Sequence, residues 1–201
     1  MKENQSQKVL RPWKTLKRRK VFTAKPWIQL SVERVRLPDG RVVDNFYQMR
    51  FLDCVVVFAQ TRVGKVLLER QYKHGIRKVT LTLPTGGVNR GEEPLLAAQR
   101  ELKEETGYVS NDWQHLGHFA QFGNMGGAHV NMFQALDAEQ VTEPKPGDLE
   151  EMEIVLRDPA ELFEAIRTGE ISILNTVTTI LMATHPSYVD FELMKPVKSL
   201  R

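Results

Sequence analysis

An α+β fold is predicted for this chain of 201 residues, and three features of the sequence predict it. Short apolar or alternating segments of strand length recur along the chain. Segments with the start and stop signals of helices lie between and after them. No segment repeats another. With 41% hydrophobic and 26% charged residues, the chain has the composition and length of one soluble domain with a sizeable core, plus an arm.

Turn residues separate the expected strands. Residues 27–37 alternate between apolar and polar side chains, Pro38, Asp39 and Gly40 form a turn, and residues 42–49 return as the second strand of a hairpin. The other expected strands are residues 54–60, 65–72, 79–84, 113–122, 128–136 and 151–156, and a polar loop is expected at 137–149.

The first expected helix has clear signals at both ends. Pro94 is well tolerated at the first helical position, and Gly107 ends the helix. Leu95, Ala98 and Leu102 follow one another at spacings of three and four, which predicts the face that packs on the core. Two further helices are expected at residues 159–168 and 172–184.

Three carboxylates crowd one side of that helix. Glu101 and Glu105 are four residues apart, and Glu104 is three from Glu101. Like charges at this spacing repel one another, and many such runs are simply solvated acidic faces. A hard divalent cation such as Mg²⁺ or Mn²⁺ would turn the repulsion into binding. Arg100 precedes Glu104 by four residues, so we expect it to hold Glu104 and leave Glu101 and Glu105 for metal.

Residues 86–108 read GGVNRGEEPLLAAQRELKEETGY, and seven of them stand at fixed spacing. The pattern is a complete Nudix box, so the chain resembles a Nudix hydrolase. The resemblance implies an α/β/α sandwich with a mixed β-sheet and metal-assisted cleavage of a diphosphate. The residues that carry it are Gly86, Glu92, Arg100, Glu101, Glu104, Glu105 and Gly107.

Segments outside the box resemble the ADP-ribose and nucleoside-diphosphate-sugar pyrophosphatases. ERQYKHG and LTLPTGG stand where that branch typically reads RQYRHG and ELPAG, and the upstream LPDGRVVDNFY also looks like its hairpin. Lys73 replaces an Arg, so the charge remains but the bidentate fork is lost. Thr82 replaces Glu, and Thr85 replaces Ala at a position that offers its backbone carbonyl.

The resemblance assigns roles to several residues. It implies that two or more Mg²⁺ ions, or Mn²⁺ in their place, are held by the Thr85 carbonyl, Glu101 and Glu105, with help from Glu104. Arg100 assists them. Lys73 and Gly86 are expected to contact a nucleoside diphosphate sugar. The general base is expected in the loop PGDLEEMEIVL, where the candidates are Asp148, Glu150, Glu151 and Glu153; Glu150 fits best and Glu151 follows.

The N-terminal hairpin of such enzymes crosses to a second subunit, so the resemblance also implies a homodimer. Aromatic side chains there stack on the nucleobase, and a cation reaches phosphate. The expected residues are Trp27, Phe46 and Tyr47 for the base and Arg50 for phosphate.

Charge is unevenly distributed along the chain. Residues 1–25 carry nine Lys or Arg and one acid, a net +8, so the remainder carries −5 of the overall +3. Blocks of like charge are typical of tails, which favours a solvated or partner-packed arm over a nucleic-acid-binding segment. We therefore expect a basic arm at 1–25, the hairpin at 26–50 and the Nudix domain at 51–201.

The single cysteine, Cys54, excludes an internal disulfide and fits a reducing cytoplasm. No apolar run reaches the length of a membrane span or of a signal peptide, so we expect a cytoplasmic protein. Two other functions stay open. One is a Nudix hydrolase of another class of substrate, such as a dinucleoside polyphosphate, an oxidised nucleotide or an RNA 5′ end. The other is a non-catalytic nucleotide-sugar sensor.

Overall fold

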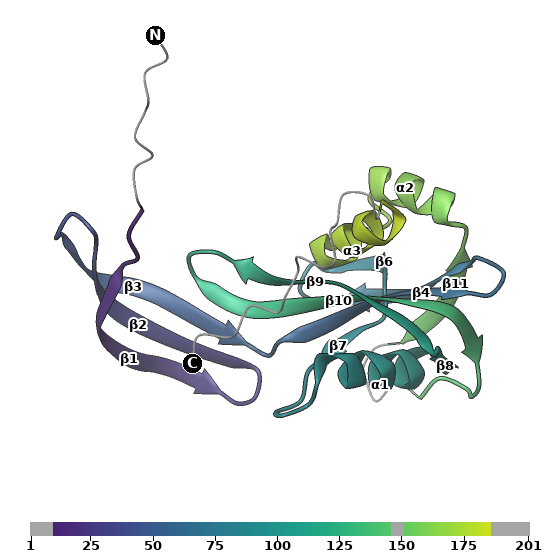
Figure 1. The fold of residues 1–201 in the computed structure, drawn as a ribbon, viewed down its shortest axis with the longest axis horizontal. Coiled ribbons are helices and arrows are strands. Elements are labelled where there is room, and N and C mark those ends of the chain that lie inside the picture. The colour runs from purple at the N-terminus through teal and green to yellow at the C-terminus, as the bar shows by residue number, and fades with distance from the viewer. Residues whose placement is uncertain (1–9, 146–150, 186–201) are drawn as a thin grey trace, which may run out of the picture. The chain divides into compact units, whose positions relative to one another are not determined.

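The computed structural model describes residues 10–145 and 151–185 (Figure 1). The chain divides into two compact units. Of the described residues, the N-terminal unit contains 10–51 and 122–127, and the main unit contains 52–121, 128–145 and 151–185.

The N-terminal unit is an antiparallel sheet of β1 (Lys14–Ala24), β2 (Ile28–Arg36) and β3 (Val42–Phe51). The arm expected at residues 1–25 is therefore a strand from Lys14 onward, and the expected hairpin has a third strand. β1 pairs with β2 along its length, and Glu33 adds side-chain contacts to this pairing. Glu33 is buried on β2 and accepts hydrogen bonds from Thr15 Oγ1 at 2.9 Å and Arg18 Nε at 2.6 Å. The remaining cations of β1 are exposed, as is usual on an edge strand.

The main unit is a mixed sheet with helices on both faces. The strands are β4 (Cys54–Thr61), β5 (Val66–Lys73), β6 (Lys78–Thr82), β7 (Thr85–Gly87), β8 (Tyr108–Val109), β9 (Asp112–Phe122), β10 (Gly126–Gln140) and β11 (Met152–Arg157). Strand β10 pairs with β4 in parallel, and β8 and β9 also pair with β10. Strand β4 pairs antiparallel with β5 and β7, and β5 pairs antiparallel with β6 and β11. The helices are α1 (Pro94–Thr106), α2 (Pro159–Arg167) and α3 (Leu174–Thr184).

Several element boundaries differ from the sequence-based prediction. The strand expected at 79–84 ends at Thr82, and the chain forms the separate short strand β7. The loop expected from residue 137 begins later, because Glu139 and Gln140 at the end of β10 pair with β8. The third helix begins at Leu174 instead of residue 172.

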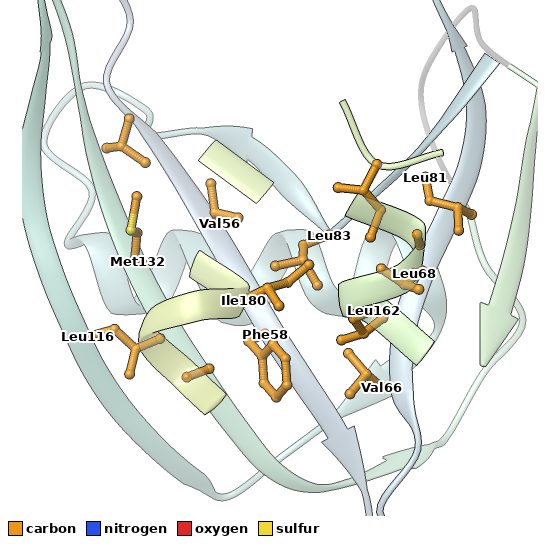
Figure 2. Close-up of a cluster of buried hydrophobic side chains, with 14 residues drawn as sticks. Val56, Phe58, Val66, Leu68, Leu81, Leu83, Leu116, Met132, Leu162 and Ile180 are labelled. Atoms are coloured by element: carbon orange, nitrogen blue, oxygen red, sulfur yellow. The ribbon is translucent and has the colours of Figure 1, made fainter. Parts of the chain in front are cut away.

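The sheet of the main unit has α1 on one face and α2 and α3 on the other (Figure 1). Alternation along each strand divides the apolar residues between two clusters. One cluster joins Val56, Phe58 and Leu68 of the sheet to Leu162 of α2 and Ile180 of α3 (Figure 2). On the other face, Val55, Val57 and Leu67 pack against Ala97, Ala98 and Leu102 of α1. This layering confirms the predicted α/β/α sandwich.

Helix α1 begins and ends where its sequence signals predict. Pro94 occupies its first turn, and Gly107 at φ 76° closes it by donating its backbone N–H to the Lys103 carbonyl at 2.9 Å. Ala98 and Leu102 are buried as expected, whereas Leu95 is 39% exposed and Ala97 takes its place in the core. In the part of the chain that the structure describes, no helix is long and apolar enough to cross a membrane.

Candidate active site

The short strand β7 holds the backbone of the glycine loop against α1. Gly86 pairs with Val55 of β4, and its Cα faces the Glu101 carboxyl group. A Cβ at this position would overlap that carboxyl group, so any other residue here would displace the Glu101 carboxyl group. The contact explains why Gly86 belongs to the pattern, and it places the loop backbone beside a predicted metal ligand.

Arg100 binds more partners than its spacing predicts. Its Nε and Nη2 donate to the two carboxylate oxygens of Glu92 at 2.9 and 3.0 Å, and Nη2 also donates to the Gly87 carbonyl at 2.9 Å. Its Nη1 lies 2.6 Å from Glu101 Oε1 and 3.3 Å from Glu104 Oε2. Arg100 therefore holds Glu104 as expected, and it also bonds to Glu101. Arg100 ties the loop to the helix and holds both carboxylates.

The bidentate ion pair of Glu92 and Arg100 shifts the pKa of both groups. Hydrogen bonds from Arg100, and then from the Asn89 backbone, lower the pKa of Glu92 to about 2. The same pair, with contributions from Glu101 and Glu104, raises the pKa of Arg100 above its usual range. Both groups are therefore charged at neutral pH, and their ion pair links the loop to the helix.

Glu105 is the buried member of the carboxylate cluster. It is 8% exposed and accepts a hydrogen bond from the Thr85 backbone N–H at 3.0 Å. Burial, and next the neighbouring carboxyl group of Glu69, raise the pKa of Glu105 far above its usual range, against the lowering effect of Thr85. Glu104 is exposed and Glu101 is intermediate, so the three acids of α1 occupy three different environments.

Glu69 is a site residue that the sequence analysis missed. It lies on β5, is fully buried, and its carboxyl group is within hydrogen-bond reach of Glu105. Gln71 Nε2 donates to Glu69 Oε2 at 2.9 Å and to Thr82 Oγ1 at 3.0 Å. An ionisable residue inside the apolar strand segment VLLERQY was the signal available in the sequence.

The chemistry of these residues fits a divalent metal. Carboxylate and carbonyl oxygens are what Mg²⁺ and Mn²⁺ prefer. Two buried carboxyl groups in contact, Glu69 and Glu105, form an environment that a cation would stabilise. Within residues 10–145 and 151–185, however, no group of three or more potential ligands is already arranged around one metal position. Arg100 bonds to one oxygen of Glu101, Oε1, and the Thr85 backbone N–H bonds to one oxygen of Glu105, Oε2.

One candidate for the general base is directed away from the site. Ile154 of β11 lies opposite Glu69 and packs in the α1 cluster, so Glu153, its neighbour, points to the other face. There Glu153 forms an ion pair with Arg70 at 3.3 Å. Glu151 is exposed just before β11. The favoured candidate, Glu150, lies outside the described residues, as does Asp148.

The residues predicted to contact substrate are divided between the two units. Lys73 is the last residue of β5 and lies on the same alternate side as Glu69 and Gln71. Gly86 lies in the main unit as well, and the other predicted contacts belong to the N-terminal unit. Trp27 and Tyr47 are 70% and 53% exposed, Arg50 is exposed, and Phe46 packs edge-to-face on Trp13 with ring centroids 5.3 Å apart.

Comparison with known families assigns most of the chain. Residues 50–175 match the NUDIX domain. The chain belongs to the Nudix family. Residues 13–49 match the N-terminal domain of nucleoside diphosphate sugar hydrolases, a match that includes β1. The protein is thus a Nudix pyrophosphohydrolase, and enzymes of this family generally need a divalent metal.

Individual relatives agree with this placement. The ADP-ribose pyrophosphatase of Bacillus subtilis (strain 168) is 30% identical over 156 residues, which cover 76% of this chain and 83% of that protein. The ADP-ribose pyrophosphatase of Mycobacterium tuberculosis is 27% identical over 171 residues, covering 84% and 81%. The crystal structure of an ADP compounds hydrolase has the same fold, with a TM-score of 0.78 at 18% identity, over 90% of this chain and 97% of that one.

Proposed function

We propose that this Nudix hydrolase cleaves the diphosphate bond of ADP-ribose or a related nucleoside diphosphate sugar, releasing a nucleoside monophosphate and a sugar phosphate. The observation that carries the proposal is the carboxylate cluster of α1 against the glycine loop, in a chain that also matches the N-terminal domain of nucleoside diphosphate sugar hydrolases. The names of its relatives from B. subtilis and M. tuberculosis support the same substrate class.

In this proposal Glu101 and Glu105 bind Mg²⁺, with Glu104 and the backbone carbonyl of Thr85, and Mn²⁺ is able to substitute. When bound, the metal supplies Lewis-acid stabilisation of the charge that develops on phosphate and makes water more acidic. Arg100 orients the ligands, because it bonds to Glu101, Glu104 and the Gly87 carbonyl at once.

A carboxylate from the segment before β11 acts as the general base. Glu150 takes the proton from the water that attacks one phosphorus, and Glu151 is the second candidate. The pairing of Glu153 with Arg70 supports this order. Lys73 contributes a positive charge for the diphosphate, and its position beyond Gln71 on β5 supports that role.

The N-terminal unit supplies the nucleoside contacts and the interface of a homodimer. Trp27, Phe46 and Tyr47 stack on the base and Arg50 contacts phosphate; the exposure of Trp27, Tyr47 and Arg50 supports this. Light scattering at micromolar concentration should give the mass of two chains, and a monomer would refute the interface.

The substrate is tested with a panel assayed in Mg²⁺. It contains ADP-ribose, other nucleoside diphosphate sugars, a dinucleoside polyphosphate and a 5′-triphosphorylated RNA. We expect the highest kcat/KM on one of the sugars, with the nucleoside monophosphate and the sugar phosphate as products. Removal of metal by EDTA should abolish turnover, and Mg²⁺ or Mn²⁺ should restore it.

The same panel separates the other functions. A higher kcat/KM on the dinucleoside polyphosphate or the RNA would indicate a different class of substrate for the same hydrolysis. Binding of the sugars without turnover, in either metal, would indicate a sensor. Full turnover in EDTA would contradict the metal assignment.

A further inference from the structure

The contact between Glu69 and Glu105 is the feature of the main unit that folding alone explains least. Glu69 is fully buried and Glu105 is 8% exposed, and their carboxyl groups adjoin. They come from different elements, β5 and α1, so the contact exists only in the folded protein. Burying a carboxyl group is costly, and placing a second one beside it adds like-charge repulsion.

A network of neutral donors fixes Glu69 in this place. Gln71 Nε2 donates to Glu69 Oε2 at 2.9 Å, and the Thr82 hydroxyl donates to the same oxygen at 3.5 Å. Thr82 is directly opposite Glu69 on the neighbouring strand β6. Gln71 also donates to Thr82 Oγ1 at 3.0 Å, which closes the network. The Glu69 carboxyl group is therefore held by rigid strands on one side and meets Glu105 on the other.

A purely structural role would be served better by a neutral side chain. Glutamine has the shape of glutamate and would avoid the second buried acid beside Glu105. A carboxylate is favoured at this position only when a positive charge comes within reach, and the acidic side of α1 is where the proposed function places one. The role of Glu69 rests on the metal site of the proposed function and extends that site to a residue outside the Nudix box.

We propose that Glu69 is a positioning residue, which holds the Glu105 carboxylate in place for the divalent metal and adds its negative charge to the site. Groups that orient a metal ligand from behind typically change metal affinity about 10- to 100-fold when they are removed. Glu69 thus strengthens metal binding at the expense of the stability of the metal-free protein.

The test measures Mn²⁺ binding without substrate, by electron paramagnetic resonance of the free ion, together with thermal unfolding. Glu69→Gln should weaken Mn²⁺ binding about tenfold or more. Its metal-free Tm should equal or exceed that of the wild type, and the rise in Tm with added Mn²⁺ should be smaller. A structural role would instead lower the metal-free Tm.

Glu170→Gln is the matched control, since it removes one acid that pairs with Arg70 and Arg157. It should leave Mn²⁺ affinity within about twofold of wild type, because these cations lie outside the network around Glu69.

A cross-strand exchange gives a second, independent variant. Residues directly opposite on antiparallel strands have Cβ atoms about 4.5–5.5 Å apart. The double variant Glu69→Thr with Thr82→Glu therefore returns a carboxylate to the same place from β6. It should recover Mn²⁺ affinity to within about threefold of wild type, whereas Glu69→Thr alone should not.

Each outcome decides the proposal. Wild-type Mn²⁺ affinity in Glu69→Gln would overturn it, and so would a folded exchange variant that stays as weak as Glu69→Thr. If Glu69→Gln and the exchange variant both fail to fold, Glu69 is structural and the proposal is wrong. The substrate panel can contradict the proposed substrate class while the effect of Glu69→Gln on Mn²⁺ binding still supports the role of Glu69. A wild type that binds no Mn²⁺ would contradict both the proposed metal site and the role of Glu69.

Discussion

The two faces of the main sheet are built from the same strands, yet they bury different chemistry. Leu68 and Glu69 are neighbours on β5 and both are fully buried. Leu68 joins the apolar cluster against α2 and α3, at whose edge burial raises the pKa of the Cys54 thiol to about 11. Glu69 points to the α1 face and meets Glu105.

Apolar residues pack on both faces, so the difference shows which face also carries the cost of buried charge. Apolar burial contributes about 25 cal/mol for each Å² removed from water, so the α2/α3 face stabilises the fold with every side chain it covers. Buried carboxyl groups contribute nothing of this kind and cost free energy unless they are compensated. The α1 face therefore accepts a local loss of stability, which only a ligand of opposite charge makes useful.

The largest expected effect distinguishes Glu150, which precedes β11 in the sequence, from Glu153, which belongs to β11. Glu150→Gln should lower kcat by about 10²- to 10⁴-fold, the usual size of a general-base effect, while Mn²⁺ binding is nearly unchanged. Glu153→Gln should keep kcat within about twofold, because Glu153 points away from the α1 face and pairs with Arg70. Steady-state kinetics at saturating substrate measures both.

The reverse pattern, with Glu153→Gln inactive, would mean that the α1 face is not where catalysis occurs. If Glu151→Gln is inactive and Glu150→Gln is not, the base is the adjacent residue and the comparison of the two faces still holds.

The next effect tests the apolar face. Phe58 is 2% exposed in the centre of the cluster in Figure 2. Phe58→Ala should lower the free energy of unfolding by about 3–5 kcal/mol, from lost burial and the cavity left behind. Because Phe58 points away from α1, kcat per folded molecule should stay within about twofold, measured well below the lowered Tm. Urea unfolding gives the stability, and Phe58→Leu offers a milder variant. A parallel fall in kcat would show that the two faces are coupled.

Features set by local signals could be predicted from the sequence. Pro94 and Gly107 define α1 within a residue, because the first-turn proline and the left-handed glycine act on their own neighbours. The acids of α1 were found for the same reason, since helical spacing alone brings Glu101 and Glu105 to one side.

Features that depend on pairing between distant segments were missed. The basic segment from Lys14 forms a strand by pairing along β2, where Thr15 and Arg18 reach Glu33. The contact of Glu69 with Glu105 depends equally on the register of β5 and on the packing of α1. The full set of Arg100 partners needed the glycine loop to be folded back on the helix.

The smallest effect concerns the link between loop and helix, and it depends on pH. Arg100 lowers the pKa of Glu92 to about 2 from an ordinary 4.5. A carboxylate with a lowered pKa in the folded state adds stability that is fully present above its unfolded pKa and is lost as pH falls through the folded pKa. Glu92→Gln should therefore lower the Tm of the metal-free protein at pH 7 by roughly 3–6 °C.

That difference should shrink between about pH 4.5 and pH 2 as the wild-type Glu92 becomes protonated, and thermal scans across this range measure it. Glu164→Gln is the control, because Glu164 bonds to Arg167 on the exposed side of α2. Exposed pairs contribute little, so its Tm should stay within about 1 °C of wild type at every pH. A Glu92→Gln difference that remains constant down to pH 2 would mean that Glu92 stabilises the loop through packing, and that the charged link of the α1 face is no more important than an ordinary surface pair.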